Sequence, residues 1–122
     1  ASVQLEKVLD RAAIMEYQEL IRRVPVADNV IDYAVDLVSK TRPDSDDSPE
    51  FIKNWIAWGA GPRASQYLIL GAKTRAAMSG NPTPSIDDVE AVALPVLRHR
   101  VLSNFNAEAD GVSIDDIIGK LL

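Results

Sequence analysis

Cysteine is absent from this 122-residue chain, and histidine occurs only once, as His99. The missing cysteines exclude disulfides, cysteine-rich zinc sites, iron–sulfur clusters and cysteine nucleophiles. The single histidine excludes metal sites built on two histidines, and no other ligand type stands at metal-binding spacing from it. Without a Gly-x-Ser-x-Gly segment, serine hydrolase chemistry is excluded as well. We therefore expect no metal site and no nucleophilic triad in this chain.

Long apolar runs and an excess of positive charge are also missing. The longest apolar run covers residues 91–97 and contains Pro95, whereas a bilayer span needs about 20 residues. The chain has 13 basic and 18 acidic side chains, a formal net charge of −5. An acidic chain repels phosphate overall, so we expect no membrane span and no nucleic-acid partner, and any anion site must be local.

Helical spacing of apolar residues runs through nearly the whole chain, and 47% hydrophobic residues can build the core of one domain. It is cleanest over residues 27–42, where one side collects Val30, Ile31, Tyr33, Ala34, Leu37 and Val38. A preceding helix, capped by Asp10 and ended by Pro25, has the same spacing at Ile14, Tyr17, Leu20, Ile21 and Val24. Further helices are predicted over residues 51–58, 62–79, 86–100 and 114–122, with 104–111 a short helix or a loop. No sustained stretch alternates apolar and polar residues with the period of two that is typical of strands, so the predicted fold class is all-α, without strands.

The predicted helix over residues 62–79 is apolar around most of its circumference, which favours a central, buried position. Its largely buried residues are expected to be Tyr67, Leu68, Gly71, Ala72 and Met78. In the preceding helix, Trp55 and Trp58 lie three residues apart, and at least one of them should anchor the following turn to the core.

Two serines begin similar segments, Ser85-Ile86-Asp87-Asp88 and Ser113-Ile114-Asp115-Asp116. In both, a serine stands three residues before an aspartate at the start of an apolar helix. This is the pattern of a capping box, in which serine and acid satisfy free backbone N–H groups. We interpret both as helix caps rather than as catalytic carboxylate pairs.

Three further patterns resemble binding sites of known kinds. The polar loop 41–49 contains aspartates, but it lacks the glycine turn and the glutamate of a calcium-binding loop, which favours a solvated loop. The string Gly71-Ala72-Lys73-Thr74 lacks the contiguous Gly-Lys-Thr and the strand of a phosphate-binding loop. For Arg98-His99-Arg100, two interpretations stay open: contact with a phosphate or an acidic partner, and favourable charge at a helix C-terminus.

The strongest local signal is Gly59-Ala60-Gly61-Pro62-Arg63-Ala64, where glycines lead into a helix opened by proline. Arg63 then stands in the first helical turn, where an acidic side chain is usually preferred. An anion lying nearby would explain that placement, because free N–H groups and the guanidinium would face it together. The alternative is a surface arginine paired with an acidic neighbour, and the residues alone leave both open.

The segment from Trp55 to Ser65 closely resembles the sensor-2 segment of MoxR-type AAA+ ATPases. Ile21–Val26, Thr41–Pro43 and Leu94–Val101 are similar to further blocks of that family, in the same order and with similar spacing. Asn104–Gly111 fits the family's ending, so the resemblance extends from about residue 9 to residue 122.

The resemblance implies a compact helical bundle of the AAA+ lid type over residues 11–122. Residues 1–10 would then lead in from an N-terminal ATPase core, which carries the Walker motifs and is missing here. Arg63 would be the catalytic sensor-2 arginine, with Gly61 and Pro62 beside it in the nucleotide-binding segment. ATP with Mg would be bound mainly by the core, and the fragment alone would have no activity.

The family also implies a context for the whole protein. Its members form homo-oligomeric rings, typically hexamers, and act in the cytoplasm as chaperones that assemble or activate protein complexes, methanol dehydrogenase among them. The client of this protein is not readable. A free-standing helical interaction module without a nucleotide role remains the alternative, and a helix-turn-helix DNA binder is disfavoured by the net charge of −5.

Overall fold

The computed structural model describes residues 3–122, which form seven helices and two short strands. In chain order the elements are α1 (Arg11–Arg22), α2 (Asp28–Lys40), α3 (Glu50–Trp55), β1 (Ile56–Trp58), α4 (Arg63–Met78), α5 (Ile86–Leu97), β2 (Leu102–Ser103), α6 (Phe105–Ala109) and α7 (Ile114–Leu121). None of these helices is both long and apolar enough for a membrane span, as far as residues 3–122 show. The all-α fold class is confirmed, apart from the two strands.

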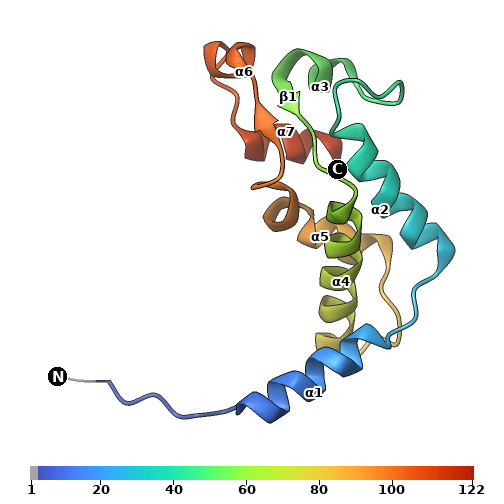
Figure 1. Ribbon diagram of the computed structural model, residues 1–122, viewed down its shortest axis with the longest axis vertical. Coiled ribbons are helices and arrows are strands. Elements are labelled where there is room, and N and C mark those ends of the chain that lie inside the picture. Colours follow the sequence, from blue (N-terminus) through green and yellow to red (C-terminus); the bar gives the residue numbers. More distant parts are fainter. Residues whose placement is uncertain (1–2) are drawn as a thin grey trace.

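The core lies where α2, α4, α5 and α7 meet (Figure 1). α4 contributes a stripe of residues four apart, each at most 1% exposed: Ala64, Leu68, Ala72 and Ala76. Three of these four are alanines, so neighbouring helices approach α4 closely. Gly71 likewise allows α5 to approach α4 closely, because a Cβ added at position 71 would lie 3.2 Å from a methyl group of Val92. Small residues therefore make α4 the central helix, packed on one side by α2 and on another by α5.

The predicted central position of α4 is confirmed, but only two of its five residues predicted to be largely buried are buried. Leu68 and Ala72 are fully buried, but Gly71 is only half-buried, Tyr67 is 42% exposed and Met78 is 84% exposed. α2, α5 and α1 contact α4 on only part of its surface, so Tyr67 and Met78 stay exposed. The apolar pattern indicated which residues favour burial, whereas the number of neighbouring elements decided which of them are covered.

The predicted helix over residues 51–58 ends early. α3 stops at Trp55, and Ile56–Trp58 form β1, which pairs antiparallel with β2. β1 has three residues and its partner lies more than forty residues away in the chain, so no local alternation signals it. Trp55 and Trp58 therefore do not share a helical face. The predicted helix 86–100 also ends earlier, at Leu97, while α6 occupies the segment that was open between helix and loop.

The predicted helix caps are confirmed. The Asp10 carboxylate accepts a hydrogen bond from the Ala13 amide, 2.8 Å away, at the start of α1. Ser85 and Ser113 each form a complete capping box with the aspartate three residues on, at the starts of α5 and α7. Local hydrogen bonding within four residues is enough for each cap, which explains why spacing alone predicts them.

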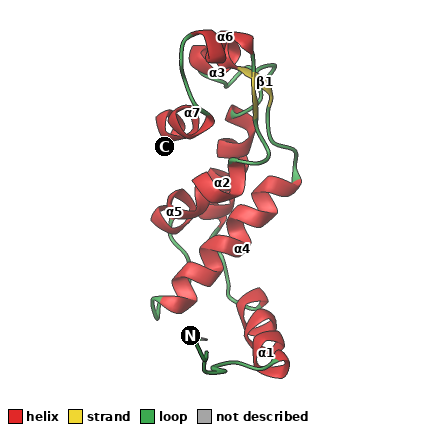
Figure 2. Cartoon of the chain, turned by 90° about the vertical axis from the view of Figure 1, so that its left-hand side faces the viewer, coloured by secondary structure: helices red, strands yellow, loops and turns green. Residues whose placement is uncertain are grey.

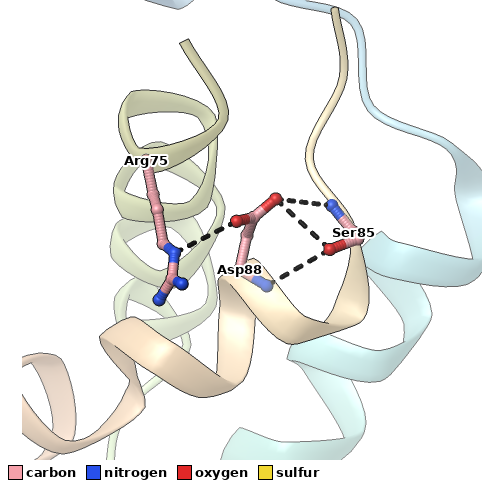
Figure 3. Close-up of polar contacts among 3 residues, drawn as sticks. All are labelled: Arg75, Ser85 and Asp88. Carbon is pink, nitrogen blue, oxygen red and sulfur yellow. Dashed lines mark hydrogen bonds and ion pairs between the residues drawn. The ribbon is translucent and has the colours of Figure 1, made fainter. Parts of the chain in front are cut away.

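The capping box of α5 has a second role, because it joins α5 to α4 (Figure 3). One Asp88 oxygen accepts from the Ser85 amide at 2.9 Å, and the other lies 3.2 Å from Nε of Arg75 on α4. Asp88 is only 7% exposed, so this ion pair is partly shielded from water. A cap that was predicted as purely local therefore also fixes the two central helices against each other.

The N-terminal region packs differently from the rest. α1 and the extended arm before it stand at one end of the molecule, away from α3, α6 and α7 (Figures 1 and 2). Residues 3–10 form no helix or strand, and the apolar side chains of Val3, Leu5 and Val8 are at least 84% exposed. α1 has no buried residue. Residues 3–10 therefore form an extended arm that does not pack on the domain, and α1 follows it from Arg11.

Candidate functional site around Arg63

Arg63 begins α4 and is exposed to solvent. The first turn of α4 has no acidic residue and no side-chain cap. Among residues 3–122, no carboxylate lies within ion-pair distance of the Arg63 guanidinium. The alternative of a surface arginine paired with an acidic neighbour therefore finds no support in the described chain, and the guanidinium is left available for an anion.

The backbone of the same turn is less available than predicted. The Ala64 amide donates to the Gly61 carbonyl at 3.0 Å, and the Ser65 amide donates to the Pro62 carbonyl at 3.3 Å. These N–H groups are already paired, so they do not stand free beside the guanidinium. The expectation that several free amides would face an anion together with Arg63 is corrected accordingly: the side chain is the main donor.

The loop that precedes α4 is held by the residues that end α2. The Ala60 amide donates to the Thr41 hydroxyl oxygen and the Arg42 Nε donates to the Ala60 carbonyl, each at 2.9 Å. Thr41 is 1% exposed, and its hydroxyl donates in turn to the Val38 carbonyl at 2.6 Å. Thr41 and Arg42 thus hold both the amide and the carbonyl group of Ala60, which lies only three positions before Arg63.

Gly59 is required for this attachment. A Cβ at position 59 would lie 2.6 Å from both the Arg42 Cα and the Thr41 carbonyl oxygen, closer than real Cβ contacts. A Cβ at Gly61 would meet no atom within 4 Å. The predicted site residues Gly61 and Pro62 therefore form the entry to α4, whereas the steric requirement for glycine lies at position 59. Sequence spacing identified the glycine-rich turn but could not distinguish its two glycines.

The other side of the loop is held through β2 and α6. The Asn104 amide donates to the Trp55 carbonyl, and the Asn104 side chain donates to the Asn54 carbonyl, each at 2.8 Å. The Trp55 indole is half-buried against the core and donates to Asp110 at 2.9 Å, which confirms that one tryptophan anchors this region. Trp58 is 72% exposed and has no such role. With anchors on both sides, Arg63 is presented from a well-fixed backbone.

A hollow of about 440 Å³ lies beside the loop. It is lined by Arg42, Pro43, Asp44, Ala57, Trp58, Gly59, Ala60 and Gly61. Its walls come from the block Thr41–Pro43 and from the glycine-rich turn. Spacing along the chain does not reveal the role of Thr41 and Arg42, because their partner Ala60 lies about 18 residues further along the sequence.

The basic cluster that follows α5 makes contacts within the domain. Arg98 forms a two-pronged ion pair with Asp115 on α7, with both N–O distances 3.0 Å. The Arg100 guanidinium lies 4.4 Å from the centre of the Tyr67 ring on α4 and donates to the Val96 carbonyl. His99 is exposed. Arg98 and Arg100 thus have partners within the domain, and Arg100 also bonds a carbonyl in the last turn of α5, which supports the interpretation as charge at a helix C-terminus.

Two groups outside the Arg63 loop have shifted pKa values. Burial, together with the charge and hydrogen bond of Glu90, raises the pKa of the Tyr33 hydroxyl. Hydrogen bonds from the Ser113 hydroxyl and amide lower the pKa of the Asp116 carboxyl, because they favour its charged form. Both shifts follow from packing or helix capping, so neither marks an acid or base at the candidate site.

The chain matches known proteins in sequence. Residues 51–121 match the family model described as the AAA lid domain. Over 119 residues the chain is 32% identical to Chaperone MoxR1 of Mycobacterium tuberculosis, covering 98% of this chain and 32% of that protein. It is 24% identical to the uncharacterized protein YeaC of Bacillus subtilis, covering 97% of this chain and 34% of YeaC.

The fold matches a solved structure as well. The crystal structure of a protein assigned as an ATPase from Cytophaga hutchinsonii aligns with 95% of this chain and 35% of its own, with a TM-score of 0.87 and 28% identity. The chain therefore spans about a third of the length of the relatives it matches. It belongs to the AAA lid domain family, as a lid of the MoxR type.

Proposed function

We propose that this chain is the lid of a MoxR-type AAA+ chaperone ATPase, and that Arg63 is its sensor-2 arginine. In this proposal ATP lies between the lid and an N-terminal core of the same protein, and the Arg63 guanidinium contacts the γ-phosphate. The observation that carries it is the exposed guanidinium of Arg63, without an acidic partner in residues 3–122, at the start of a helix whose entry loop is fixed by Thr41 and Arg42.

The contribution of Arg63 would be electrostatic. A guanidinium placed beforehand near the transferring phosphoryl group stabilises its charge in the transition state without reorganisation. Loss of the γ-phosphate removes that contact, so the angle between lid and core would follow the nucleotide state. Among residues 3–122, no three carboxylate or histidine side chains gather to hold a cation. The Mg²⁺ that accompanies ATP would therefore be held mainly by the core.

The wider assembly follows from the family. We propose a homo-oligomeric ring, typically a hexamer, that works in the cytoplasm, where ATP is available. Its task would be to assemble or activate protein complexes, as the name of Chaperone MoxR1 suggests for that relative. Regulation of an enzyme of the methanol dehydrogenase kind is one form this task takes in the family. No residue of this lid identifies the client.

The test compares two arginines that each begin a helix, Arg63 in α4 and Arg11 in α1. In the full-length protein, Arg63→Ala should lower ATP turnover by about 100-fold, the usual effect of losing one preorganised donor. Arg11→Ala should leave turnover unchanged. Arg63→Lys should restore little, because lysine has no planar fork of donors. Steady-state ATPase assays and thermal melting of each variant provide the measurement.

Two outcomes would contradict the proposal. Equal turnover for Arg63→Ala and Arg11→Ala would remove the nucleotide role and favour a helical interaction module instead. ATP turnover by the purified 122-residue chain alone, with contaminating ATPases excluded, would show that a phosphate-binding site had been overlooked. We expect no turnover there, because the sequence has no phosphate-cradling loop.

A further inference from the structure

Arg63 lies between two buried alanines at the entry to α4. Ala60 and Ala64 are each 1% exposed and belong to the hydrophobic core, whereas Gly61, Pro62 and Arg63 between them are exposed. A short link between two fixed points leaves the backbone little freedom, and the Pro62 ring fixes one of its torsion angles. The position of the Arg63 guanidinium therefore depends on what holds Ala60 and Ala64.

The two alanines are held in different ways. Ala64 belongs to the buried stripe of α4, so apolar packing holds it. Ala60 precedes the helix, and its amide and carbonyl are bonded to Thr41 Oγ1 and Arg42 Nε, each at 2.9 Å. Figure 1 shows the end of α2 beside the connection from β1 to α4. Ala60 cannot move relative to the end of α2 without losing at least one of these two hydrogen bonds.

Ser48 holds Arg42 in turn. The Ser48 hydroxyl donates to the Arg42 carbonyl, and Ser48 is only 7% exposed. The Ser45 amide donates to the same carbonyl at 3.2 Å, so the polar loop folds back onto Arg42. The Thr41 hydroxyl also donates to a carbonyl in the last turn of α2. We call Thr41, Arg42 and Ser48 the Ala60 clamp, because their hydrogen bonds form one connected set that ends at Ala60.

We propose that the Ala60 clamp positions Arg63 for its contact with the γ-phosphate, so that Thr41 and Arg42 are positioning residues for ATP hydrolysis. This inference rests on the proposed function. Preorganised groups must be held within about 0.5 Å of their productive place, and a shift at Ala60 passes to Arg63 through the short link between them. The clamp therefore acts through Arg63 on the rate of the chemical step, and less on the binding of ATP by the core.

The test measures kcat and KM for ATP in the full-length protein. Thr41→Val removes the acceptor for the Ala60 amide but keeps the side-chain shape, and Arg42→Met removes the donor but keeps the aliphatic stem. Each should lower kcat about tenfold while KM changes less than about threefold, because a misplaced donor is lost mainly from the transition state. Thr41→Ser keeps the hydroxyl and should restore most of the parent kcat. Ser48→Ala should act in the same direction with a smaller effect, since it reaches Ala60 only through Arg42.

The matched control is Thr83→Val. The Thr83 hydroxyl also ties two segments of the chain, because it donates to the Pro25 carbonyl at 2.8 Å. Thr83 lies between α4 and α5, at the opposite end of α4 from Arg63, so this variant should leave kcat unchanged. Thermal melting establishes that each variant is folded at the assay temperature. Arg42→Met, at a half-buried position, remains the test if the buried Thr41→Val does not fold.

Combination with Arg63→Ala separates positioning from an independent effect. If the clamp acts through Arg63, adding Thr41→Val or Arg42→Met to Arg63→Ala should lower kcat no further. A further large fall in the Arg63→Ala background would overturn the inference, because the clamp would then act without Arg63. An unchanged kcat in both single clamp variants would also overturn it, while the proposed function stands if Arg63→Ala still lowers turnover. Full turnover in Arg63→Ala would overturn both.

Discussion

α1 and α2 have the same kind of sequence and opposite packing. Both are amphipathic helices of similar length with apolar residues at helical spacing. In α2 the apolar side is covered, and Leu37 is 3% exposed. In α1 the corresponding side stays open, and Leu20 is 59% exposed. An amphipathic pattern therefore identifies which face of a helix favours burial, but not whether this chain provides the surface that buries it.

Two other pairs repeat the comparison at smaller scale. Gly59 packs against the end of α2, whereas Gly61 two residues later has open space around it. Asp88 and Asp116 complete identical capping boxes, but only Asp88 also meets an arginine from another helix. In each pair the local motif is shared and the tertiary neighbour differs. Substitutions within each pair measure what the neighbour adds.

The largest difference is expected for the two leucines. Leu37→Ala should lower the free energy of unfolding by about 2–5 kcal/mol, because it leaves a cavity in the core. Leu20→Ala should change it by about 0.5 kcal/mol or less, because the side chain is already in water. Urea unfolding of both variants gives the values. Equal losses would mean that α1 packs on the domain in solution, and the contrast between α1 and α2 would fail.

The glycine pair comes next. Gly59→Ala should destabilise the domain by about 1–3 kcal/mol, since the new methyl group forces the loop away from Thr41 and Arg42. Gly61→Ala should be neutral or stabilising by up to about 1 kcal/mol, because alanine restricts the unfolded chain. In the full-length protein, Gly59→Ala should also lower ATP turnover by displacing Arg63. If both variants melt like the parent protein, the attachment of the loop to α2 contributes no rigidity.

The capping boxes allow a finer comparison. Asp88→Ala should cost about 1–2 kcal/mol, because it removes a cap and leaves Arg75 without its partner. Asp116→Ala should cost less, since it removes only an exposed cap. A double-variant cycle with Arg75→Ala separates the ion pair from the cap in α5. Equal effects at the two aspartates would show that the contact between α4 and α5 through Arg75 adds nothing.

The smallest effect concerns pH. Hydrogen bonds from Ser113 lower the pKa of Asp116 in the folded state, so its charged form stabilises the fold above the ordinary carboxyl pKa. That contribution should fade as the pH falls below about 4, toward the lowered pKa. Unfolding free energies measured between pH 3 and 6 should therefore decline less steeply for Ser113→Ala than for the parent chain. Identical pH profiles would contradict the shift.

Much of the fold was predictable because its signals are local. Caps at Asp10, Ser85 and Ser113 need only a serine or aspartate and an amide three residues on. The start of α4 was predicted from the glycines and Pro62. Arg63 was identified because it places a cation in the first helical turn, where an acidic side chain is usual. The resemblance to the MoxR-type lid then gave the family, which the comparisons confirmed.

The remaining features depend on residues far apart in the chain. β1 exists because Ile56–Trp58 find a partner at Leu102–Ser103. Thr41 and Arg42 hold Ala60 from about 18 positions away, which no spacing rule connects. By itself, the sequence determined the helices, their caps and the odd position of Arg63, because these follow from backbone geometry within a few residues. Only the tertiary structure decided which apolar faces are covered and which glycine is needed, because burial and close approach depend on what another part of the chain places there.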